Sequence, residues 1–239
     1  MTTSSQLTPS ARAEPRARAP GRRVNDAPTR MFHWLFALSF TGAYATAESE
    51  HLRLLHVTLG YTLGGLLAFR LLYGLVGPRQ LRLGALWRRL AGVPAWLRSG
   101  WRAPGQWRQG QHLLMALALA SLLLLVLPLT LSGYATFNDW GGHALEEAHE
   151  FFGNAFLAVA LAHVGLVVAM SLLRRQNLAA PMVTGRTAAP GPDLVKANRV
   201  WLAIVLLLAV LAFGGWQWQQ SPNGLFSATP AARSMRGED

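Results

Sequence analysis

Histidine is the main metal-binding residue type in this chain, because the sequence contains no cysteine. The lack of cysteine excludes disulfides, thiolate zinc sites, iron–sulfur clusters and haem attached through thioethers. The seven histidines are His33, His51, His56, His112, His143, His149 and His163. Of these, His149 and His163 are 14 residues apart. In an α-helix this spacing is nearly four turns and about 21 Å, so both imidazoles would face one side of the helix at two depths.

Histidines in two earlier apolar segments match these two depths. His33 lies near the inner end of the first segment, at the level of His163, and His56 lies near the outer start of the second, at the level of His149. A six-coordinate haem iron requires two facing imidazoles at one depth. The pairs His33–His163 and His56–His149 therefore predict two haems stacked across a membrane. Zinc is a rival for either pair, although structural zinc usually takes four ligands. Hydrogen-bonded packing and proton relay are the other roles open to a membrane histidine.

Arg70 is an isolated charge inside the second apolar segment, 14 residues after His56. At about 1.5 Å per residue it would lie near the inner histidine level. Two roles remain open there: Arg70 could bind a haem propionate in bidentate fashion, or extend its side chain to the cytoplasmic surface. The remaining histidines, His51, His112 and His143, fall at segment ends or in loops and are interpreted as interfacial.

The composition indicates that these side chains lie in a membrane protein. Of the 239 residues, 51% are hydrophobic and only 14% are charged, yet the formal net charge is +11. This combination excludes an average soluble enzyme and argues against a disordered basic chain that binds nucleic acid, which would lack long apolar runs. Five segments are apolar enough to be membrane helices, at about residues 31–47, 54–76, 112–136, 148–173 and 200–218. The expected fold is an all-α membrane protein with a four-helix bundle holding two b haems, plus a fifth C-terminal transmembrane helix.

The charge distribution predicts the orientation. Six arginines precede the first span, seven lie between the second and third spans, and a further basic group lies between the fourth and fifth. The opposite side carries Arg53, Arg233 and Arg236, together with the acidic residues Glu48, Glu50, Asp139, Glu146, Glu147 and Glu150. The positive-inside rule then places the N-terminus in the cytoplasm and the tail after the fifth span outside.

The chain divides into three predicted regions. Residues 1–29 are interpreted as a disordered basic cytoplasmic tail, residues 30–186 as the transmembrane bundle, and residues 187–239 as a linker, the fifth helix and an outer tail. The loop at residues 79–108 mixes arginine with tryptophan, which could suggest nucleic acid. Between two membrane spans, tryptophan at the headgroup level and arginine facing anionic lipid are favoured instead, so we expect no nucleic-acid partner.

Several segments resemble the bacterial cytochrome b-561 family, which is related to the cytochrome b subunits of nickel–iron hydrogenases. The similar segments are residues 30–34, 56–61, 69–78, 149–150, 162–163 and 177–185. The resemblance covers about residues 28–186. It implies a four-helix bundle with two b haems, in which His33 and His163 ligate the inner haem and His56 and His149 the outer haem. The basic tail and the fifth helix lie outside this family core.

The expected function is electron transfer in a bacterial inner membrane. The chain would pass electrons between the quinone pool and a periplasmic partner such as a c-type cytochrome, with haem performing the redox change. One alternative is a superoxide:quinone oxidoreductase, although the acidic outer face would repel the superoxide anion. Another is a haem-bearing subunit of a larger oxidoreductase or photosynthetic complex. A transporter with intramembrane histidines is the alternative without haem.

Overall fold

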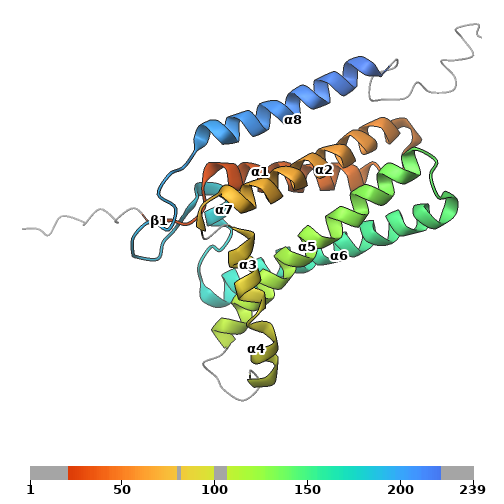
Figure 1. The fold of residues 1–239 in the computed structure, drawn as a ribbon. Helices are drawn as coiled ribbons and strands as arrows, with labels where there is room; N and C mark the ends of the chain where they lie inside the picture. The colour runs from red at the N-terminus through yellow and green to blue at the C-terminus, as the bar shows by residue number, and fades with distance from the viewer. Residues whose placement is uncertain (1–20, 80–81, 100–106, 222–239) are drawn as a thin grey trace, which may run out of the picture.

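The computed structural model describes residues 21–79, 82–99 and 107–221. These residues are mainly helical (Figure 1). The helices and strands in chain order are β1 (Arg22–Arg23), α1 (Ala27–Ala45), η1 (Glu50–Leu52), α2 (Arg53–Val76), α3 (Leu83–Leu90), α4 (Val93–Ser99), α5 (Trp107–Phe137), α6 (Gly142–Arg174), α7 (Ala180–Thr184), β2 (Arg186–Thr187) and α8 (Val200–Gln220).

Two helical hairpins form the body of the molecule. The first consists of α1 and α2 and the second of the longer α5 and α6, while α8 lies along α1 on the outside of the first hairpin (Figure 1). The buried cluster that joins the hairpins takes residues from all four of their helices: Phe40, Leu63, Leu67, Val126, Leu129 and Phe156. The short elements β1, β2, α3, α4 and α7 gather at the end of the bundle where α1 begins, here called the N-terminal end (Figure 1). The opposite end is called the far end.

Four helices in the described residues are long and apolar enough to cross a membrane. They span Glu50–Val76, Gly110–Phe137, Gly142–Arg174 and Val200–Gln220, and so correspond to η1 with α2, α5, α6 and α8. Many large apolar side chains on them are exposed, as expected for surfaces that face lipid. The segment predicted at residues 31–47 is the 19-residue helix α1. It is not among the four because Arg30, His33 and small polar residues lower its mean hydropathy. The described residues confirm a helical chain with several membrane helices, and the fifth crossing stays a prediction.

The first helix begins earlier than the sequence patterns suggested. Asp26 is its N-cap, with the carboxylate accepting a hydrogen bond from the backbone N–H of Thr29, and Pro28 occupies the first turn. A carboxylate at the N-cap and a proline in the first turn are strong start signals for a helix. Residues 21–29, which we assigned to the basic tail, therefore form β1 and the start of α1, while residues 1–20 lie outside the described residues.

The segment after α6 folds over the start of α1. Strand β1 pairs with β2 in antiparallel fashion, and the N–H of Val24 donates to the carbonyl of Gly185 at 2.8 Å. The side chain of Arg30 donates to the carbonyl of Val183 at 2.6 Å, and the indole N–H of Trp34 donates to the carbonyl of Met182 at 2.9 Å. We call this arrangement of β1, β2 and α7 the N-terminal latch. It fixes the angle at which α1 enters the bundle, and so the direction in which His33 projects.

Candidate functional site

The first predicted pair, His56 and His149, is brought into contact near the far end of the bundle. His56 comes from the first turn of α2 and His149 from the second turn of α6. The centres of their rings are 6.0 Å apart and the ring planes are at 85°. The hairpin packing of α1 with α2 and of α5 with α6 thus places two imidazoles from distant sequence positions beside one another, with their ring planes nearly perpendicular.

Backbone carbonyls hold both of these imidazoles. His56 Nδ1 is 2.8 Å from the carbonyl oxygen of Ala43, and His149 Nδ1 is 3.1 Å from that of Leu129. A carbonyl can only accept, so each Nδ1 carries the proton and donates it. The other ring nitrogen, Nε2, then has a free lone pair. This is the arrangement found for metal-binding histidine, where a second hydrogen bond fixes the tautomer and the ring direction.

The ring separation tests whether one iron fits between the two histidines. A metal–imidazole bond of about 2 Å, with the nitrogen about 1 Å from the ring centre, places the centres of two rings on opposite sides of one metal about 6 Å apart. The observed separation is 6.0 Å. The separation of the rings and their protonation therefore fit two histidines that would hold one haem iron.

Glycines leave room around this pair. Gly60 follows His56 by one helical turn, and a Cβ built on it would meet no atom within 4 Å. Gly133 of α5 faces His149 so closely that an added Cβ would lie 2.7 Å from the Cε1 of the imidazole. The glycine at position 133 is thus required by the position of the His149 ring, because any larger residue would displace it.

The second predicted pair, His33 of α1 and His163 of α6, lies nearer the N-terminal end. The Nδ1 atoms of both are buried and have no hydrogen-bond partner among the described residues. Buried polar atoms are nearly always paired in native proteins, so these two orphaned ring nitrogens indicate a missing partner. The donor chemistry of this pair fits a second metal-centred cofactor.

Arg70 is placed by the structure in a polar cluster at the N-terminal end. It is 8% exposed, and its guanidinium lies beside Gly74, where an added Cβ would be 3.2 Å from Nη1. The charge of Asp26 and the hydroxyl of Tyr73 both influence the guanidinium. A carboxylate of the chain itself thus lies in the surroundings of Arg70, which the spacing argument from His56 did not reveal.

Asp26 is the centre of this polar cluster and is fully buried. Its carboxylate accepts hydrogen bonds from the hydroxyl of Thr29 at 2.6 Å and from the hydroxyl of Tyr73. Arg199, the N-cap of α8, approaches the carboxylate to 3.6 Å and donates to the Tyr73 oxygen at 3.3 Å. The cluster ties α1, α2 and α8 together. Sequence reasoning missed it, although the Asp-x-Pro start of α1 signals an N-cap at position 26.

The three remaining histidines are exposed, as their positions at segment ends and in loops predicted. His51 lies in η1, His112 near the start of α5 and His143 in the first turn of α6. His143 Nδ1 is 3.3 Å from a carboxylate oxygen of Glu147 on the same helix. In the described part of the chain, no three His, Cys, Asp or Glu side chains gather where they could hold a metal ion. Each candidate site thus offers two histidines.

A comparison with protein families identifies the bundle. The family model for prokaryotic cytochrome b561 matches residues 24–185, which is more than half of the chain. No match was found among curated proteins or among solved structures. The family consists of membrane cytochromes that take part in electron transfer and bind b-type haem. The matched region contains α1, α2, α5 and α6 with all four paired histidines and ends within the N-terminal latch. The chain is therefore a multi-pass membrane protein that belongs to the prokaryotic cytochrome b561 family.

Proposed function

We propose that this chain is a dihaem cytochrome that passes electrons across the bacterial inner membrane, between the quinone pool and a periplasmic partner such as a c-type cytochrome. The observation that carries the proposal is the pair His56–His149. Its ring centres are 6.0 Å apart and each Nδ1 is engaged by a carbonyl. His33 and His163 supply the second haem site.

The residues of the chain hold and separate the two sites. His56 and His149 would hold the outer haem iron through Nε2, and the carbonyls of Ala43 and Leu129 keep that nitrogen unprotonated. His33 and His163 would hold the inner haem iron. When bound, haem supplies the one-electron redox change. The surrounding apolar side chains exclude water and keep the local dielectric low.

An aromatic pair lies between the two histidine levels. Phe40 is seven residues beyond His33 on α1, and Phe156 lies midway between His149 and His163 on α6. The centres of their rings are 4.3 Å apart in the buried cluster that joins the hairpins. This pair fills the space between the proposed haem sites with packed hydrocarbon instead of water.

The proposed topology has five crossings, with α1 as the first and α8 as the last. Helix α1 packs against both α2 and α8, which are themselves apolar enough to cross the membrane. In the part of the chain that the structure describes, basic residues concentrate at the N-terminal end of the bundle, and the positive-inside rule makes this end cytoplasmic. The pair His56–His149 then lies toward the periplasm.

The far end offers an acidic surface to a partner. Six carboxylates of the described residues are exposed there: Glu48, Glu50, Asp139, Glu146, Glu147 and Glu150. Such a surface steers a basic protein toward the outer haem site and raises the association rate. It also repels the superoxide anion, which favours the carrier over the alternative of a superoxide:quinone oxidoreductase. The exposed apolar face of α8 supports a second candidate, in which the chain is a haem-bearing subunit of a larger redox complex.

The first test of the proposal is a haem count. The full-length protein, purified in detergent, should contain two b haems per chain by pyridine haemochrome analysis and a reduced-minus-oxidised spectrum. His56→Ala and His163→Ala should each reduce the count to one, because each removes a ligand of a different site. His143→Ala is the matched control and should keep both haems, since that side chain is exposed and lies outside the pairs.

The outcomes separate the proposals. One haem in the unaltered protein would mean that one of the two pairs is misassigned. No haem would remove the carrier and leave a transporter or a membrane anchor. An unchanged count in His56→Ala would show that the 6.0 Å pair is not a haem site.

A further inference from the structure

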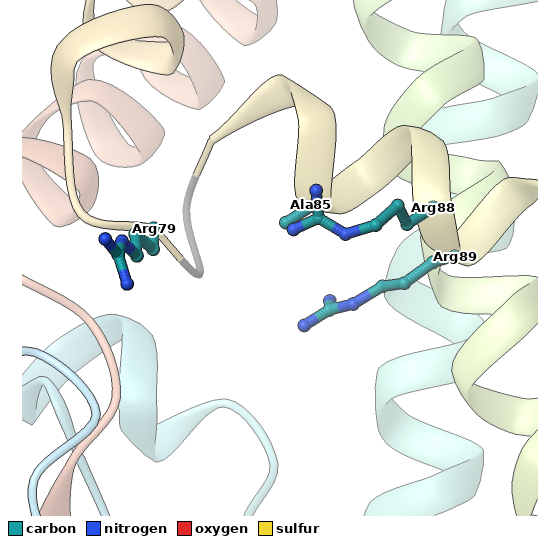
Figure 2. A pocket seen from close by; sticks show the side chains of 4 residues that line it. All are labelled: Arg79, Ala85, Arg88 and Arg89. Carbon is teal, nitrogen blue, oxygen red and sulfur yellow. The ribbon is translucent and has the colours of Figure 1, made fainter.

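A basic hollow lies at the N-terminal end of the bundle, outside the histidine sites. It is an open cavity of about 320 Å³ lined by Arg79, Ala85, Arg88 and Arg89. Arg79 follows the end of α2, and the other three residues belong to α3. The side chains of Arg88 and Arg89 extend from α3 into the gap that separates this helix from Arg79 (Figure 2). Three arginines thus line one hollow.

The hollow is built by the way α3 packs on the bundle. Leu83, Leu86 and Leu90 recur along one side of α3 and are half-buried, while α3 contacts both α2 and α5. Gly74 of α2 admits Leu83, because a Cβ at position 74 would lie 2.6 Å from the Leu83 side chain. With this apolar side docked, Arg88 and Arg89 remain exposed.

The arginines of the hollow have no acidic neighbour. The sequence contains no Asp or Glu from His51 to Asn138. Within the described residues, no ion pair joins Arg79, Arg88 or Arg89 to a carboxylate. Arginine binds phosphate in bidentate fashion, and three uncompensated guanidinium groups would repel one another without an anion among them. The hollow therefore has the charge of an anion site whose counter-ion comes from outside the chain.

The surroundings of the hollow place it at a lipid headgroup level. Helix α3 follows α2 and precedes α5, both apolar enough to cross the membrane, so it lies where these helices leave the bilayer. Trp87 of α3 is 73% exposed, and tryptophan favours the membrane–water interface. Leu72, Leu75 and Val76, at the end of α2 just before Arg79, are also exposed. An apolar surface of this kind would receive acyl chains, which a free phosphate ion lacks.

We propose that this hollow is a binding site for an anionic phospholipid with two phosphate groups, diphosphatidylglycerol. Three arginines match its double charge better than the single charge of phosphatidylglycerol. Basic pockets between transmembrane helices on the cytoplasmic side are suited to such headgroups. The bound lipid offsets two of the three positive charges and holds α3 against the ends of α2 and α5. This site does not depend on haem or on the redox partner.

Native mass spectrometry of the delipidated full-length protein tests the proposal. Diphosphatidylglycerol should bind as one retained molecule per chain, and phosphatidylcholine should not. The variant Arg88→Gln/Arg89→Gln should weaken diphosphatidylglycerol binding about twenty-five-fold, since an arginine near an anionic lipid contributes about fivefold in affinity. The matched control Arg98→Gln/Arg175→Gln removes two exposed arginines at the same end of the bundle, outside the hollow, and should keep the affinity within about twofold.

Further measurements keep the proposal falsifiable. The haem spectrum shows that each variant is folded, and Arg79→Gln alone should weaken binding about fivefold if the double variant does not fold. If the double variant and its control lose equal affinity for diphosphatidylglycerol, the effect is one of general charge, and the specific site is overturned. Displacement of the lipid by millimolar inorganic phosphate would mean a soluble phosphate site instead. Equal retention of phosphatidylglycerol would overturn the preference for two phosphates.

Discussion

Two backbone carbonyls decide which nitrogen of each outer histidine is available. Ala43 accepts a hydrogen bond from Nδ1 of His56, and Leu129 accepts one from Nδ1 of His149. The rings are thereby fixed in direction and tautomer before any ligand is bound. For the proposed outer haem site this is preorganisation, because the chain would not have to reorient two side chains to hold an iron.

At the scale of single residues, the close approach of Gly133 to His149 gives a testable prediction. Gly133→Ala would place a Cβ 2.7 Å from Cε1 of His149, so the imidazole must turn or move. We expect the outer haem to be lost or to change its axial ligand geometry, while the inner haem is kept. Electron paramagnetic resonance of the oxidised protein checks this, since the two haems should give separate low-spin signals.

The control for this substitution lies on α8. Gly215 has no atom within 4 Å of a built Cβ, and Gly215→Ala should leave both signals unchanged. If Gly133→Ala also leaves both signals unchanged, the added Cβ does not disturb a haem ligand. His149 then either does not hold an iron or does not lie as close to position 133 as the structure places it.

At the scale of elements, the N-terminal latch determines where α1 enters the bundle. Gly185 ends α7 with φ +78°, a left-handed conformation, and its carbonyl accepts hydrogen bonds from the backbone of Val24 and Asn25. The buried carboxylate of Asp26 then caps α1 and approaches Arg199 at the start of α8. Three helices therefore depend on a few residues that lie next to one another only after folding.

Gly185→Ala tests the latch. The new Cβ would lie 2.8 Å from the carbonyl oxygen of Asn25, in a backbone conformation that disfavours L side chains. We expect a destabilisation of about 1–3 kcal/mol, seen as a lower Tm for haem release. Gly84→Ala is the control, because Gly84 is in the helix α3 with its nearest neighbour 3.8 Å away, and it should not lower Tm. Equal Tm values for both variants would show that the latch does not limit stability.

At the scale of the whole molecule, charge is separated between the two ends. Basic residues dominate the N-terminal end and exposed carboxylates the far end. In a membrane this separation sets the orientation, and at the far end it sets the sign of the field that a soluble partner meets.

The orientation gives a prediction about accessibility. The chain contains no cysteine, so single substitutions can report each loop without background. We expect a membrane-impermeant maleimide to label Ala47→Cys and Ala144→Cys in intact spheroplasts, and Ala91→Cys and Ala197→Cys only after lysis. All four alanines are exposed. Labelling of Ala47→Cys only after lysis would show that α1 does not cross the membrane.

The acidic far end gives a prediction about partner binding. In Glu146→Lys/Glu147→Lys, the field near the outer site changes sign locally, so electron exchange with a basic c-type cytochrome should slow about tenfold at low ionic strength. Stopped-flow absorbance measures the rate. The milder variant Glu146→Gln/Glu147→Gln should give a rate between those of the unaltered protein and the lysine variant. The differences between the three rates should shrink in high salt. Equal rates at low salt would contradict steering by these carboxylates.

The sequence by itself determined the features that depend on local composition and helical period. Long apolar runs predicted α2, α5, α6 and α8, because a helix in lipid must satisfy its own hydrogen bonds whatever its neighbours. The 14-residue spacing of His149 and His163 places both on one side of α6 by geometry alone. The family followed from short motifs in the same segments and was confirmed. The ligand roles of the four histidines and the number of haems stay predictions.

Only the tertiary structure decided the features that depend on which segments meet. The contact of His56 with His149, the carbonyls that fix their tautomers and the close approach of Gly133 arise from helices far apart in the chain. The Asp26 cluster joins residues from three helices, and α1 begins at Ala27 because that carboxylate caps it. A hydrophobic pattern states which face of a helix is buried but not which partner covers it, because apolar packing is non-directional.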